Sequence, residues 1–209
     1  MLIAALACAT SVSVSAQSPE DHEKPAPRES GPQAAGLFAA GVASGLLSHE
    51  AGHLLFDVVF DADPGLRRVE FGGVPFFAIT HRGDLSRRRE YTISSAGFWT
   101  EHALSEWVLS AHPHLREQRR PYLKGLLAWQ LLSSAVYTVA ALGKIGPPER
   151  DTRGMAASLD VSERWIGVVL VVPAACDAWR YFDPDARWPR WLSRTVKVGL
   201  VLAAMAVRG

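Results

Sequence analysis

The sequence predicts an all-α polytopic membrane protein with four to five transmembrane helices and a short β-hairpin after the first helix. Hydrophobic residues make up 48% of the chain. They gather into blocks of about 18 to 25 residues, which is the length that crosses a bilayer. Polar stretches that contain proline and glycine separate these blocks, and a β-prone stretch follows the first long one.

The N-terminal end is predicted to be a leader and a linker. Residues 1–16 are small and apolar and end in Val-Ser-Ala, which is typical of a signal-peptidase site. Because this run is short for a spanning helix, we expect a cleaved signal peptide rather than an uncleaved anchor. Residues 17–33 mix proline, serine and charge without apolar periodicity, so they are predicted to form a flexible linker. Residues 34–209 form the membrane-embedded domain.

The first long block, residues 36–60, carries the most informative motif. On a helix His49 and His53 lie four residues apart on one face, as two imidazoles must to hold one metal ion. Glu50 between them suits a general base acting on metal-bound water. Ionisable groups in an apolar block are costly unless they face a protein interior or water, so the pattern indicates a metal site.

The chain after the first helix is predicted to form a hairpin and further helices. Two β-prone runs within residues 69–80 are divided by Gly72 and Gly73, which predicts a hairpin. Residues 144–162 read as a polar connection that contains proline and glycine. Helices are predicted over residues 91–111, 122–143 and 163–182, with a fifth of marginal length at 191–207.

A catalytic zinc site takes three protein ligands and keeps one position open, so the two histidines need a partner. By helix rise, Glu101 lies about 15 Å into its helix, at a depth that matches the histidines. Asp177 follows Pro173, which loosens the helix, and it lies either buried as a ligand or near the headgroups. Asp57 either orients His53 or is an acid at the helix end.

These pieces resemble the site-2 protease family of intramembrane zinc proteases. In that family an H-E-x-x-H motif lies in a membrane helix, as at residues 49–53, and a β-rich stretch follows. The next helix of the family begins with A-G-P-x-x-N, to which AGFWTE at residues 96–101 is similar, with Phe98 and Glu101 as departures. The family's Pro-preceded L-D-G motif is similar to PAACDA at residues 173–178.

The resemblance implies a zinc metallopeptidase with one Zn²⁺ ion that hydrolyses a membrane-associated peptide bond. His49, His53 and Asp177 would be the metal ligands, and Glu50 the catalytic residue that activates a zinc-bound water. Glu101 stays open as the alternative ligand. The implied partners are the lipid bilayer and a membrane-protein or peptide substrate, and the implied location is the bacterial inner (plasma) membrane as an integral multi-pass protein.

Composition argues against some functions, and two rivals to the peptidase remain. A formal net charge of +1 without a basic stripe argues against nucleic-acid binding. Neither of the two cysteines belongs to a C-x-x-C pair, so neither a disulfide framework nor a thiolate zinc site is expected. The first alternative is a non-proteolytic multi-pass membrane protein whose metal site has a binding or purely structural role, in which Glu50 would be dispensable. The second is a small membrane scaffold whose H-E-x-x-H pattern is accidental, in which purified protein would contain no stoichiometric zinc.

Overall fold

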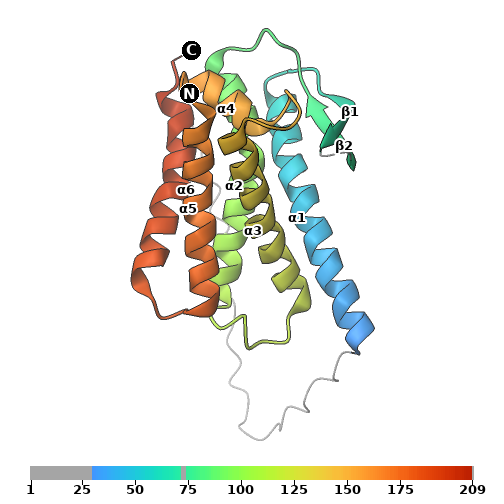
Figure 1. Ribbon diagram of the computed structural model, residues 1–209, viewed down its shortest axis with the longest axis vertical. Helices are drawn as coiled ribbons and strands as arrows, with labels where there is room; N and C mark the ends of the chain where they lie inside the picture. The colour runs from blue at the N-terminus through green and yellow to red at the C-terminus, as the bar shows by residue number, and fades with distance from the viewer. Residues whose placement is uncertain (1–29, 72–73, 209) are drawn as a thin grey trace, which may run out of the picture.

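The computed structural model describes residues 30–71 and 74–208. Five long helices run up and down along the long axis of the molecule, and a short helix and a hairpin lie at one end (Figure 1). In chain order the elements are α1 (Gly31–Val59), β1 (Gly65–Phe71), β2 (Val74–Thr80), α2 (Arg87–Ala111), α3 (Pro121–Gly143), α4 (Asp151–Leu159), α5 (Glu163–Phe182) and α6 (Arg187–Ala206).

The start of α1 corrects one boundary of the predicted linker. The hydroxyl of Ser30 accepts a hydrogen bond from the backbone N–H of Gln33 at 3.4 Å, so Ser30 is the N-cap of the helix. Residues 31–33 are therefore helical rather than part of a linker. The predicted signal peptide and the first part of the linker lie outside the described residues.

Glycines bring α1 into close contact with α2 and α3. A Cβ atom added at Gly41 would overlap the carbonyl oxygen of Tyr122, and one at Gly125 would overlap that of Phe38. About three turns further along α1, a Cβ at Gly52 would lie 2.6 Å from the carbonyl oxygen of Ala96 in α2. Because these residues have no side chains, the backbones approach closely and one face of α1 is enclosed by its two neighbours.

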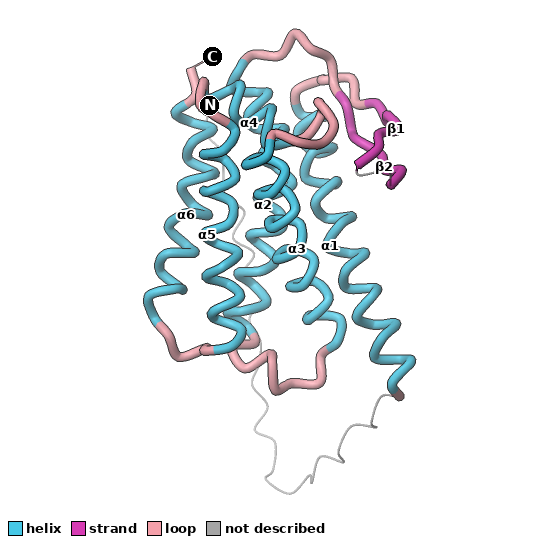
Figure 2. The backbone as a smooth tube through the Cα atoms, viewed as in Figure 1, coloured by secondary structure: helices cyan, strands magenta, loops and turns pink. Residues whose placement is uncertain are grey.

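The hairpin predicted after the first helix is present. β1 and β2 pair antiparallel with Gly65 opposite Thr80, and the hairpin stands beside the end of α1 (Figure 2). Its base is joined by a hydrogen bond of 2.9 Å from the backbone N–H of Arg82 to the carbonyl of Ala62. This arrangement places the hairpin at the open side of the candidate site described below.

All the predicted long helices exist, but the number of membrane spans is not confirmed. In the described part of the chain, α3 and α5 are the two helices long and apolar enough to cross a membrane by length and composition. Helices in the core of a soluble bundle can meet the same standard, and half of the most apolar window of α3 is buried. The finding supports two candidate spans rather than the four to five expected.

A candidate metal centre

His49 and His53 lie on the face of α1 that α2 covers, and both are buried, at 2% and 5% exposure. Gly97 of α2 lies directly against them. A Cβ atom at this position would be 2.5 Å from Nε2 of His53 and 2.6 Å from Nε2 of His49. The two imidazoles therefore occupy space that only a glycine leaves free.

The third member of the group is Asp151, the first residue of the short helix α4. Its Oδ2 atom lies 3.2 Å from Nε2 of His49 and 3.4 Å from Nε2 of His53. The two Nε2 atoms are 3.1 Å apart. Gly154 brings this helix close to α2, because a Cβ there would overlap the hydroxyl of Ser94.

The triangle formed by these three atoms has the size of a metal site. A tetrahedral ion with bonds of about 2.0–2.1 Å keeps its ligand atoms about 3.3–3.4 Å apart. The three observed separations fall between 3.1 and 3.4 Å. His49, His53 and Asp151 thus form a group that can hold a metal ion.

The outer nitrogen of each ring indicates where its proton lies. Nδ1 of His53 donates to the backbone carbonyl of Ile93 at 2.7 Å. Nδ1 of His49 is 3.0 Å from Oε1 of Glu101, a close contact that does not meet the geometry of a regular hydrogen bond. With protons on Nδ1, both Nε2 atoms direct lone pairs at the Asp151 carboxylate. Three converging lone pairs repel one another unless a cation lies between them, so the donor set fits a metal.

Neighbouring groups keep Asp151 and Glu101 in place. Burial raises the pKa of the Asp151 carboxyl, but when the two imidazoles are protonated and hold no metal, their charges and hydrogen bonds lower it well below its usual range. Tyr137 of α3 lies close to Asp151, and its ring stacks on that of His49 with centroids 5.8 Å apart. The hydroxyl of Ser133 donates to the Glu101 carboxylate at 2.8 Å.

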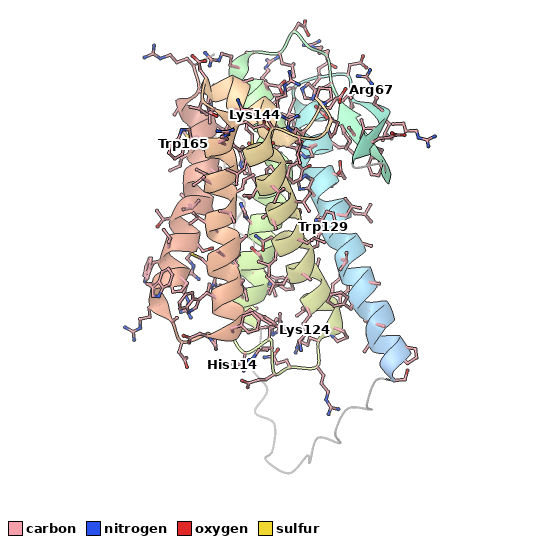
Figure 3. All side chains as sticks on the ribbon, viewed as in Figure 1. Arg67, His114, Lys124, Trp129, Lys144 and Trp165 are labelled. Carbon is pink, nitrogen blue, oxygen red and sulfur yellow. The ribbon has the colours of Figure 1, made fainter. Side chains whose placement is uncertain are left out.

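The centre opens into a cavity of about 630 Å³ between α1, α2, α3, α4 and the hairpin. Glu50 lines it together with the three members of the group. Two other residues of its wall, Arg67 on the hairpin and Trp129 on α3, are labelled in Figure 3. Most of the remaining wall is apolar, with Leu46, Ile79, Ile93, Leu132, Val136 and Ala140.

The structure brings His49, Glu50 and His53 to one cavity, but not Asp177. The Asp177 carboxylate is fully buried elsewhere, 2.6 Å from Nζ of Lys197 and 3.1 Å from Nη1 of Arg180. Within the described residues α5 and α1 make no contact, so this carboxylate cannot reach the histidines. The predicted grouping of Asp177 with the two histidines is therefore corrected, because the carboxylate grouped with them is that of Asp151. Glu101, the alternative, lies behind His49 at its outer nitrogen.

Asp151 was missed because residues 144–162 look like a plain polar connection. It is 102 positions from His49, so no short spacing motif joins the two. The local signal was an acidic residue at the start of a short helix, a position favoured by the helix dipole. That signal predicts the helix start but not the partner.

Fold and centre together define a helical-bundle protein with a buried H-E-x-x-H group that can hold a metal ion. No known protein family, curated protein or solved structure matches the chain. The resemblance to site-2 proteases therefore stays a prediction from the sequence motifs.

Proposed function

We propose that this protein is a zinc-dependent peptidase that acts at or within a membrane. The observation that carries the proposal is the position of Glu50, on the same cavity as the three converging donor atoms. Two imidazoles and one carboxylate are the ligand set of catalytic zinc in thermolysin-like enzymes. A structural zinc site would instead be closed by a fourth protein ligand, and no fourth is grouped with these three in the described residues.

The carboxylate of Glu50 is available to accept and donate a proton. Within the described residues it makes no hydrogen bond or ion pair, whereas Glu101 accepts from Ser133 and Glu163 pairs with Arg150. When bound, zinc supplies Lewis acidity, which acidifies water and polarises a carbonyl group. Glu50 then accepts a proton from the attacking water and passes it to the leaving amine.

The walls of the cavity favour an apolar substrate segment. Side chains from four helices and the hairpin line it, and about half of them are aliphatic or aromatic. A cavity of about 630 Å³ accommodates a few residues of an extended peptide with apolar side chains beside the scissile bond.

The distribution of polarity supports a membrane setting. The interior contains charged and polar side chains, among them His49, Glu101, Gln130, Asp177 and Lys197. Large apolar side chains face outward on four helices instead: Leu47 and Val58 on α1, Val139 and Leu142 on α3, Trp165 and Val169 on α5, and Val198 and Leu202 on α6. So much exposed apolar surface is unusual for a soluble monomer and suits contact with lipid.

The test is a Glu50→Gln substitution in detergent-purified protein. The probe is a fluorescence-quenched peptide with a leucine-rich transmembrane segment, and zinc is counted by mass spectrometry. We expect the variant to keep one zinc ion and to cleave the probe about 10²–10⁴-fold more slowly, because it lacks the general base. Equal cleavage by the two proteins would refute the role of Glu50, and retained zinc without any cleavage by the wild-type chain would favour the non-proteolytic alternative.

A further inference from the structure

We propose that Asp57 and His81 form a second divalent-cation site in the same cavity, with Glu90 orienting the imidazole. Both Asp57 and His81 line that cavity. The proposal concerns cation binding only and does not depend on hydrolysis at the first centre.

Asp57 is a buried carboxylate without a hydrogen-bond partner in the described part of the chain. It lies four residues beyond His53 on the same face of α1, which corresponds to about 6 Å along the helix axis. Its side chain is fully buried, and neither carboxylate oxygen has a hydrogen-bond partner within the described residues. A buried carboxylate is costly unless it is paired or bound to a cation. Its nearest ionisable neighbour is His81, whose Nδ1 lies 3.6 Å from Oδ1.

Glu90 of α2 sets the orientation of the His81 ring. Nε2 of His81 lies 2.7 Å from Oε2 of Glu90, and the other oxygen of Glu90 accepts from the hydroxyl of Ser94 at 3.1 Å. When Nε2 donates its proton to Glu90, Nδ1 presents a lone pair toward Asp57. The first centre has a similar arrangement. There the carboxylate of Glu101 faces Nδ1 of His49, and Nε2 is the nitrogen directed at the metal position. A carboxylate behind a ligating imidazole is a recurrent feature of metal sites.

The donors indicate which ions would bind and how strongly. One imidazole nitrogen and one carboxylate suit Zn²⁺, Co²⁺ or Mn²⁺ better than Ca²⁺ or Mg²⁺. The separation of 3.6 Å is close to the spacing of about 3.3–3.4 Å between ligands of one ion. Two side chains rather than three hold the ion, so this site binds more weakly than the first. His53 and Asp57 are about 6 Å apart along the helix axis. This spacing exceeds the metal–metal distance of about 3.5–4 Å in centres where two metals act on one substrate group.

The test is a metal titration of the full-length chain in detergent after removal of metals by a chelator. Co²⁺ is followed by its visible absorption and Zn²⁺ by calorimetry. We expect two equivalents in the wild-type protein, the second at least tenfold weaker. His81→Ala and Asp57→Asn should keep the first equivalent, which also shows that they are folded, and weaken the second at least tenfold. The control is His114→Ala, since His114 is exposed at the opposite end of the bundle (Figure 3).

Three results would overturn the second site: saturation of the wild-type protein at a single equivalent, a second equivalent that survives both substitutions, or its equal loss in the His114 control. The two proposals can fail separately. A His49→Ala protein that loses the tight equivalent and keeps the weak one would support both centres. Absence of a tight equivalent in the wild-type chain would count against the zinc peptidase alone.

Discussion

Replacing Gly97 by alanine tests whether the histidines are packed against α2. The new Cβ would lie 2.5 Å from Nε2 of His53 and 2.6 Å from Nε2 of His49, whereas ordinary contact begins at 3.4 Å. Each ring must therefore retreat by about 0.8–0.9 Å, several times the deviation of about 0.2 Å that metal–ligand bonds tolerate. Overpacking of this kind costs about 1–3 kcal/mol. If that cost falls on the bound state, zinc affinity drops about 5- to 150-fold.

The assay is competition for zinc with a chromophoric chelator, with thermal unfolding measured on the same samples. The matched control is Gly199→Ala in α6, because a Cβ there meets no atom within 4 Å. We expect the control to bind zinc as the wild-type protein does and to be as stable or slightly more stable, since alanine favours a helix. Unchanged zinc affinity in the Gly97→Ala protein would show that the imidazoles do not lie against this glycine.

Two further predictions separate the metal centre from the buried charges around Asp177. Asp177→Ala removes the carboxylate that pairs with the buried ammonium group of Lys197. The protein should therefore lose about 3–5 kcal/mol of unfolding free energy and keep its zinc. Loss of zinc with unchanged stability would contradict this prediction. Glu101→Gln weakens the support of His49, and zinc affinity should fall about 10–100-fold without a change in stoichiometry, whereas an unchanged affinity would remove Glu101 from the centre.

The local features of the site could be predicted because they depend on short-range geometry. Four-residue spacing on a helix puts His49 and His53 on one face, wherever that helix lies. Helix rise likewise converts sequence position to depth, and Glu101 does lie beside His49 in the structure. The hairpin followed from two β-prone runs with glycines between them.

The carboxylate beside the two histidines could not be predicted, because its position depends on how distant helices pack. Asp177 is on α5, which packs on α3 and α6. Its carboxylate accepts a hydrogen bond from Lys197 and does not lie near the histidines. Asp151 reaches the histidines only because Gly154 lets a nine-residue helix lie close to α2. Neither fact can be read from spacing or hydropathy.

The most direct test of the metal centre is X-ray absorption at the zinc edge, on the wild-type, Asp151→Ala and Asp177→Ala proteins. We expect about one tight zinc ion per chain in the wild-type and Asp177→Ala proteins, with two imidazole nitrogens and a carboxylate oxygen at about 2.0–2.2 Å. The Asp151→Ala protein should lose that ion or show one oxygen fewer. A zinc environment unchanged by Asp151→Ala, or altered by Asp177→Ala instead, would contradict the assignment of His49, His53 and Asp151.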